Sequence, residues 1–371
     1  MHFSSSFFIL VVKIYIILMQ NSYLSIRFLA VFLLVQMFCW TDSFSQITSL
    51  QTGIHNKQLE WKLSGEYLLW QISMEGLDIA ADNAYIDYFP PAHRGRSYGV
   101  SFPWKSGVQI GVGAIFPESQ GTELELVYSW LYPVVKENIS TDPVVQTFPF
   151  YSVKPTERLP NSQVFVVDHL ATFQSYYHLL DFRMGRENQI VPAFRVTPYL
   201  GLRSTWQKQL WDTNLQMFTQ NPVISNYIYN YIQNFQGAGP LFGGRFKFFF
   251  LKKYPIFENF ALIGNIAIAG ILGNIQVDSQ FSAVSPFSNF VYSSNQKTIF
   301  TLVPVWDLSV GLLFEKIFSK GTKVFSAIRF NILWESQSWI GFNKMQSSVV
   351  YFSTPSSMTV QGLTAGLGLV F

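Results

Sequence analysis

The sequence predicts an all-β fold, a transmembrane antiparallel up-and-down β-barrel of about ten strands. Only 13% of the residues are charged and 49% are hydrophobic, whereas a soluble domain carries about 25% charged residues. Beyond residue 58, apolar and polar side chains alternate with a period of two, as in strands that have one apolar face. Short and long joins between these segments alternate, which is the rhythm of an outer-membrane barrel.

The N-terminus carries the pattern of a secretory signal. Arg27 precedes an apolar run at 28–40, and Ser43 and Ser45 provide small residues for cleavage before Gln46. A permanent helical anchor needs about 20 apolar residues, and this run is shorter. We therefore predict a signal peptide at 1–45 with Met19 as an alternative start, a short periplasmic lead-in at 46–58, and the barrel at 59–371.

The clearest hairpin joins segments 107–116 and 123–132 through a turn at 117–121. In the first segment, apolar residues alternate with three glycines and Gln109. In the second, apolar residues such as Leu126 alternate with polar residues such as Glu125. Both segments have the roughly 9 to 11 residues that a tilted membrane-spanning strand needs. They therefore predict two neighbouring strands with one lipid-facing side each.

Eight further strands follow from the same alternation. They lie at 61–69, 180–184, 195–206, 242–250, 260–277, 300–315, 323–335 and 363–371. The joins between successive strands alternate in length. Short joins lie at 117–121, 186–192, 251–259 and 316–322. Long polar joins, which we expect to be outer loops, lie at 77–106, 133–170, 207–234, 278–297 and 338–357. The even count and this rhythm place both termini in the periplasm. Twelve or more strands remain an alternative, because further strands could lie within the long loops.

Aromatic residues stand near the predicted strand ends, where girdle residues of outer-membrane barrels sit at the headgroup level. They are Trp61, Trp70, Trp130, Tyr132, Trp206, Trp211, Trp334 and Trp339. The chain ends on Phe371 with apolar residues at alternate positions before it, which resembles the C-terminal signal for barrel insertion. The loop at 207–234 is rich in tyrosine and isoleucine, which predicts either contact with another surface or folding of the loop inward over the bore.

Charged and polar residues occupy the face opposite to the apolar one, so we predict that they line the lumen. They are Lys62, Glu66, Glu123, Glu125, Asp181, Arg183, Arg195, Tyr199, Arg203, Arg245, Lys247, Asp307, Arg329 and Glu335. Walls of mixed charge are consistent with a water-filled constriction. On the later strands the basic residues outnumber the acidic ones, which predicts a weak anion preference. Ten strands leave at most a narrow passage, and the charges could also neutralise one another and fill it.

Several short segments resemble one known family in their order along the chain. Residues 64–71 and 75–80 read Ser-Gly-Glu-Tyr-Leu-Leu-Trp-Gln and Glu-Gly-Leu-Asp-Ile-Ala. Further matching segments lie at 104–107 with 111–113, 179–182 with 185–186, 197–203, 237–243, 264–273 and 307–312. Together they resemble the Legionella-type and chlamydial major outer membrane proteins. The resemblance implies a pore-forming barrel and no catalytic residue. The turn around 118–121 departs from the family pattern, and the cysteines of the chlamydial protein are absent.

The predicted function is therefore passive diffusion of small hydrophilic solutes or ions through a multi-pass barrel of the bacterial outer membrane. A structural or adhesive barrel is the alternative, and an outer-membrane hydrolase a remote one, since Asp168 and His169 are adjacent in a strand and point to opposite faces. No cofactor, metal site or nucleic-acid partner is expected. The expected partners are membrane lipid and the barrel-assembly machinery, and association into a homo-oligomer is left open.

Overall fold

The computed structural model describes residues 59–74, 78–82, 97–99, 101–116, 122–140, 147–149, 164–219, 224–250, 259–285, 288–318, 326–345 and 356–371. The predicted signal peptide and lead-in lie outside the described residues, as do the turn at 117–121 and parts of the predicted outer loops. Among the residues described, no helix is long and apolar enough to cross a membrane.

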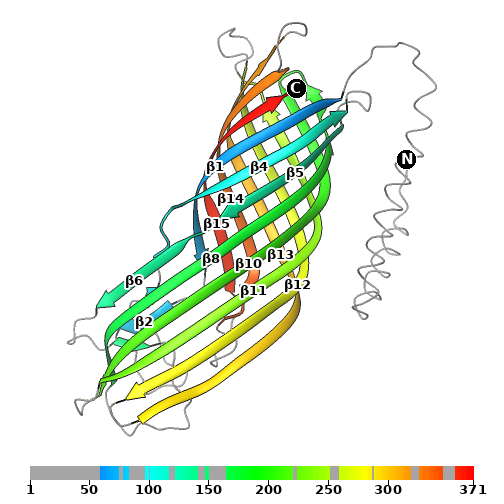
Figure 1. Cartoon of the computed structure of the whole chain (residues 1–371). Helices are drawn as coiled ribbons and strands as arrows, with labels where there is room; N and C mark the ends of the chain where they lie inside the picture. The colour runs from blue at the N-terminus through cyan, green and yellow to red at the C-terminus, as the bar shows by residue number, and fades with distance from the viewer. Residues whose placement is uncertain are drawn as a thin grey trace, which may run out of the picture. The chain divides into compact units, whose positions relative to one another are not determined.

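Ten of the twelve strands in the main sheet close an antiparallel barrel (Figure 1). They are β1 (Glu60–Met74), β4 (Lys105–Phe116), β5 (Thr122–Leu131), β8 (Val164–Arg186), β10 (Phe194–Thr219), β11 (Ile224–Phe248), β12 (Phe260–Ser285), β13 (Ser288–Ile317), β14 (Ala327–Asn343) and β15 (Ser356–Val370). Pairing of β1 with β15 and of β8 with β10 completes the ring. The predicted fold class and strand number are therefore confirmed.

In the part of the chain that the structure describes, five short strands lie outside the ring. Strand β6 (Val134–Ser140) pairs with β8, and β9 (Asn188–Val191) pairs with β10. A separate sheet contains β2 (Asp78–Asp82), β3 (Ser97–Gly99) and β7 (Thr147–Pro149). These short strands add local structure without widening the barrel.

Two of the predicted long loops are wrong. Residues 207–219 and 224–234 continue β10 and β11 as paired strands, and residues 278–285 and 288–297 continue β12 and β13. In Figure 1 these strands run well beyond β4 and β5, away from the end that carries the C-terminus. The error has a physical reason: past the lipid, the outward side chains become polar, so the apolar face that marks a membrane strand disappears while the backbone pairing continues.

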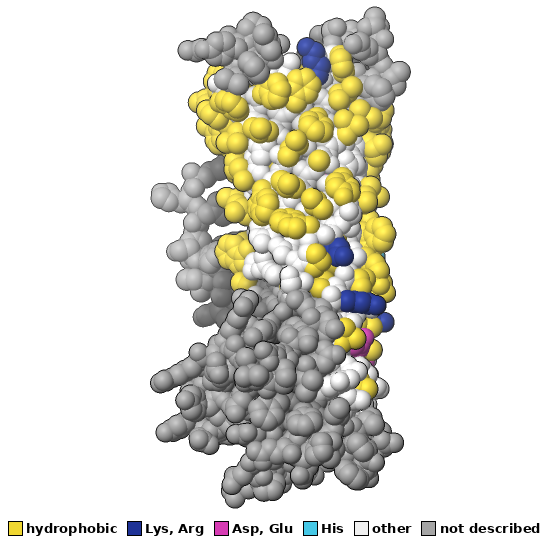
Figure 2. All heavy atoms as spheres, turned by 90° about the vertical axis from the view of Figure 1, so that its left-hand side faces the viewer, with side chains coloured by type: hydrophobic (Ala, Val, Ile, Leu, Met, Phe, Trp, Pro, Cys, Tyr) yellow, Lys and Arg dark blue, Asp and Glu magenta, His cyan; other side chains and the backbone are white. Residues whose placement is uncertain are grey.

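The outward face carries an apolar belt, as the alternation predicts. Leu126, Ile110, Ile266, Leu308 and Leu367 are all 41% to 55% exposed although each lies in a fully paired strand. Figure 2 shows this belt on one side of the barrel, with Lys and Arg side chains at its lower margin. A large exposed apolar surface on a closed barrel is the surface that faces hydrocarbon.

Three of the predicted girdle residues are inside the barrel instead. Trp70, Trp211 and Trp339 are at most 1% exposed, whereas Trp206 and Trp334 are about 40% exposed. The strand period explains the difference, because positions 206 and 211, or 334 and 339, have opposite parity and therefore opposite faces. Trp61, Trp130 and Tyr132 are also exposed, as predicted.

A lipid-facing charge should destabilise the barrel far more than a lumen-facing one. We expect Leu126→Arg to cost about 2 to 4 kcal/mol of folding free energy in vesicles, the cost of arginine near the bilayer midplane. Gln109→Arg is the matched control, because Gln109 lines the interior cavity described below. Glu125 would be a poor control, since it is buried between Lys62 and Arg245. Urea unfolding in phosphatidylcholine vesicles measures both; equal losses would contradict the assigned facing.

Candidate functional site

The lumen contains a cavity of about 200 Å³ in the part of the barrel nearer the start of β1 and the C-terminus. Ten of the predicted lumen residues line it: Lys62, Glu66, Glu123, Glu125, Arg183, Arg245, Lys247, Asp307, Arg329 and Glu335. Asp181, Tyr199 and Arg203 are buried, and Arg195 is paired with Glu187. The structure thus brings together the side chains that alternation places on one face.

A network of ion pairs crosses this cavity. Lys62 Nζ donates to Glu123 Oε1 at 2.8 Å and to Glu125 Oε1 at 2.7 Å. Arg245 donates to the other oxygens of the same carboxylates, at 3.0 Å and 3.1 Å. Because β11 and β5 are three strands apart around the ring, Arg245 reaches across the lumen rather than along its wall.

At the edge of the cavity, Arg203 holds two aspartates in a buried cluster. Its Nε and Nη2 donate to both oxygens of Asp181 at 2.7 Å, and Nη1 and Nη2 donate to Asp307 at 3.0 Å and 2.6 Å. Arg183 also donates to Asp181, at 2.7 Å. Bidentate pairs of this kind fix geometry as well as energy. The Arg203 cluster joins β8, β10 and β13, which the sequence separates widely.

Two acids that sequence reasoning left out of the lumen set complete the pairing near the termini. Glu187 accepts from Arg195 at 3.0 Å and from Lys247 at 2.9 Å, and Glu315 is paired with Arg329. Burial of the Glu187 carboxyl raises its pKa, but Lys247 and Arg195 outweigh that effect and hold the pKa below its usual value. Glu315 lies an even number of residues after Asp307 on the same strand, so alternation could have placed it on the lumen face. Glu187 lies between two strands, where the sequence has no alternation to indicate its direction.

Glu66 and Glu335 accept hydrogen bonds from neutral groups. Asn331 Nδ2 donates to Glu66 Oε1 at 3.1 Å, and Thr364 Oγ1 donates to Glu335 Oε2 at 2.9 Å. Counting the cavity lining gives five basic residues against six acidic ones. The excess of basic residues that the sequence predicts for the later strands is offset in the whole lining, because Glu66, Glu123 and Glu125 of the first strands also line the cavity.

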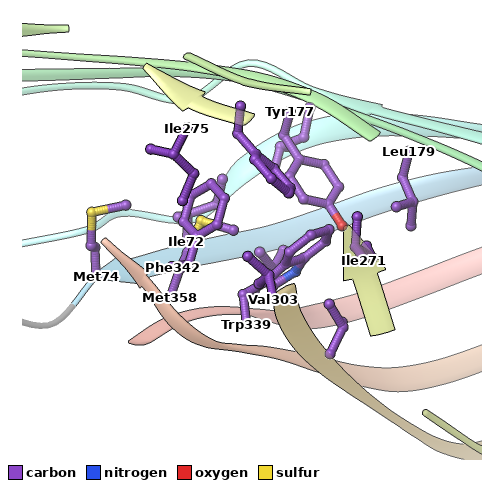
Figure 3. Close-up of a cluster of buried hydrophobic side chains, with 14 of the residues drawn as sticks. Ile72, Met74, Tyr177, Leu179, Ile271, Ile275, Val303, Trp339, Phe342 and Met358 are labelled. Atoms are coloured by element: carbon purple, nitrogen blue, oxygen red, sulfur yellow. The ribbon is translucent and has the colours of Figure 1, made fainter. Parts of the chain in front are cut away.

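Beyond the cavity, many lumen-facing positions carry apolar side chains that pack into one buried cluster (Figure 3). The ring of Tyr177 on β8 lies 6.0 Å from that of Trp339 on β14, edge to face, and Phe235 lies 5.4 Å from Phe342. Tyr177 Oη also donates to Gln337. Strands β8 and β14 are five places apart in a ring of ten, so these contacts join opposite walls. We call this set the apolar plug: Leu68, Trp70, Ile72, Phe173, Tyr177, Phe235, Trp339, Phe342 and Met358.

Part of the plug is the end of β14, which turns into the lumen. Gly341 has a φ of 64°, and the β14–β15 register shifts between Trp339 and Asn343. Glycine adopts this left-handed conformation without the cost that a Cβ adds. Gln233 Nε2 then donates to the carbonyl of Phe342 at 3.1 Å and Gln233 Oε1 accepts from the Lys344 amide at 2.8 Å. Residues 341–345, the inturned segment, are thus held at two backbone points by one side chain.

The family model described as the Legionella pneumophila major outer membrane protein precursor matches residues 54–371. The chain belongs to this family. The predicted family and the bacterial outer-membrane localisation are therefore confirmed, the latter by the barrel fold as well. A search of curated proteins found no match.

Several solved structures resemble the chain weakly. The outer membrane protease OmpT from Escherichia coli is 12% identical with a TM-score of 0.40, over 84% of this chain and 97% of that one. A FadL homologue from Pseudomonas aeruginosa is 8% identical with a TM-score of 0.26, over 85% and 90%. Ail from Yersinia pestis is 9% identical with a TM-score of 0.20, over 85% and 99%.

The histidines that the sequence analysis considered as possible catalytic residues do not belong to the charged cavity of this family member. His178 Nδ1 is 2.7 Å from Tyr128 Oη, and its ring stacks on Trp206, which belongs to the exposed belt. The side chains of Asp168 and His169 lie outside the described set. Within the described residues, no group of three or more His, Cys, Asp or Glu side chains could hold a metal ion.

Proposed function

We propose that this protein is a narrow outer-membrane pore for small hydrophilic solutes or ions, closed in this state by the apolar plug. The observation that carries the proposal is the charged cavity inside the barrel. Buried ion pairs contribute little to stability compared with apolar side chains of similar size. The presence of the charged residues Lys62, Arg245, Glu123 and Glu125 in the cavity wall is therefore better explained by contact with water and ions than by a purely structural role. The proposal assigns no enzymatic activity.

The apolar plug favours a second function, a structural barrel without conductance. It joins opposite walls and leaves its largest side chains, such as Trp339 and Phe342, with no exposed surface. The adhesive form of this alternative has less support, because two aromatic residues of the predicted exposed loop, Tyr229 and Tyr231, are at most 3% exposed. Planar-bilayer conductance of the refolded protein separates the two: a folded barrel that never conducts supports the structural function.

Ion selectivity tests whether ions pass through the charged cavity. With five basic and six acidic lining residues, we expect weak selectivity, in place of the anion preference that the sequence predicted. Gln109 is a neutral lining residue that accepts from Ser129 at 3.2 Å. Gln109→Lys should shift the reversal potential across a KCl gradient toward anion preference, and Gln109→Glu toward cation preference, because fixed wall charge concentrates its counter-ion. Identical potentials for the two variants would place the conduction path elsewhere.

Partners follow from the same proposal. Membrane lipid would surround the belt, and the barrel-assembly machinery would read the C-terminal Phe371, whose side chain is 40% exposed at the end of the barrel. Small hydrophilic solutes or ions would be the cargo. Association into a homo-oligomer is compatible with an exposed belt and is not required by the lumen.

A further inference from the structure

Directly beyond the lipid belt, the outward face of β11, β12 and β13 changes to carboxamide side chains. On β12 the outward positions run from Leu272, the last apolar one, through Asn274 and Gln276 to Asp278 and Gln280. Gln236 and Asn234 on β11 pair in register with Asn274 and Gln276. On β13, Gln296 pairs with Asp278 of β12. We call the set Asn234, Gln236, Asn274, Gln276, Gln280 and Gln296 the amide surface.

The edge between belt and amide surface follows one row of paired residues. Trp206 pairs with Gln236, Gln236 with Asn274, and Asn274 with Phe300. Trp206 is 40% exposed and Phe300 60% exposed, so an aromatic ring stands at each end of the row. The amide surface is therefore continuous with the lipid-facing belt. Groups that lie at the headgroup level of the membrane, directly beyond the hydrocarbon, would contact the amide surface.

The chemistry of the amide surface fits a neutral polyhydroxylated ligand. Each carboxamide offers two donors and an acceptor without charge, which matches hydroxyl groups. The Asp278 carboxylate among them also accepts from hydroxyl groups and repels phosphate, whose preferred partners are cations. Neighbouring strands lie about 4.8 Å apart and alternate residues about 6.6 Å apart. The amides thus form a grid on the scale of one sugar ring, with apolar ring faces of Trp206 and Phe300 beside it.

We propose that the amide surface binds the saccharide headgroup of the glycolipid in the surrounding outer leaflet. The continuity with the belt selects this occupant, because the sugar attached to a lipid that packs on Leu272 and Phe300 is held at the height of Asn274 and Gln276. Gln276 donates to Asp278 at 3.2 Å, which orients its amide and leaves its oxygen available to a hydroxyl group. The saccharide would fix the barrel's depth in the membrane.

Calorimetric titration of the refolded protein with phosphate-free core oligosaccharide, released from lipopolysaccharide, tests the proposal. We expect the triple variant Gln236→Ala, Asn274→Ala, Gln276→Ala to bind about tenfold more weakly than wild type, a loss equivalent to one or two hydrogen bonds. Gln189→Ala is the matched control, because Gln189 is an exposed amide on β9, near the termini, and it should bind like wild type.

Titration with lipid A, which has phosphates but lacks the core sugars, separates the two parts of the glycolipid. We expect the triple variant and wild type to bind lipid A equally, and both to unfold at the same urea concentration in phosphatidylcholine vesicles, which shows that the variant is folded. The proposal is overturned if wild type fails to bind the oligosaccharide, if the triple variant binds it equally well, or if the difference appears with lipid A instead.

Discussion

Replacing Arg203 with leucine is expected to destabilise the barrel by about 3 to 5 kcal/mol, the cost of leaving a buried charge without its partner. Arg203 has no exposed surface and donates to Asp181 and Asp307 through four hydrogen bonds. Asp181 retains Arg183 in the variant, so the unpaired charge is that of Asp307. Urea unfolding followed by tryptophan fluorescence measures the loss.

The double variant Arg203→Leu, Asp307→Leu separates charge from packing. We expect it to be more stable than Arg203→Leu alone, because a buried ion pair replaced as a pair by apolar residues loses little. Arg186→Leu is the control, since Arg186 is exposed at the end of β8 and surface substitutions usually change stability by less than about 0.5 kcal/mol. A double variant no more stable than the single one would mean that Arg203 acts through its volume.

The membrane explains why so much of the fold was predictable. Lipid requires each membrane-spanning strand to carry apolar side chains on its outward face, and in a closed barrel outward and inward residues alternate along the strand. The sequence alone therefore predicts that Leu126 faces outward and Glu125 inward. The same rule explains the failures. Outside the lipid the rule no longer applies, so the pattern does not reveal residues 207–219 and 278–285 as strands, although both stretches pair with neighbouring strands.

The sequence predicts which residues face the lumen but does not predict which of them contact one another. Parity identifies Arg203 and Asp307 as inward residues, but their contact depends on strands three places apart in the ring. Parity also places Trp70 and Trp339 inside, against the tendency to assign every tryptophan near a strand end to a girdle. The inturned segment has no signal with a period of two, because the shift after Trp339 changes parity and brings Phe342 inward as well.

Loss of the Gln233 contacts should open the lumen. We expect Gln233→Ala to raise the mean planar-bilayer conductance about tenfold, because the two hydrogen bonds that hold the inturned segment are worth about 1 to 3 kcal/mol together. The segment would then leave the bore for a larger fraction of the time, taking Phe342 away from Phe235. Gln207→Ala is the matched control, since Gln207 is an equally buried lumen glutamine that donates to Thr205, on its own strand.

A reversible crosslink decides whether the movement of this segment causes the opening. Asn343 and Ser356 are paired across β14 and β15, and directly opposed residues of an antiparallel pair have Cα atoms within the range that a disulfide bridges. The chain has one cysteine, Cys39, so protein produced from residue 46 onward carries only the engineered pair. In the Gln233→Ala background, we expect oxidised Asn343→Cys, Ser356→Cys to conduct like wild type and reduction to restore the higher conductance. If conductance stays high after oxidation, the inturned segment is not the barrier and the path opens elsewhere in the apolar plug.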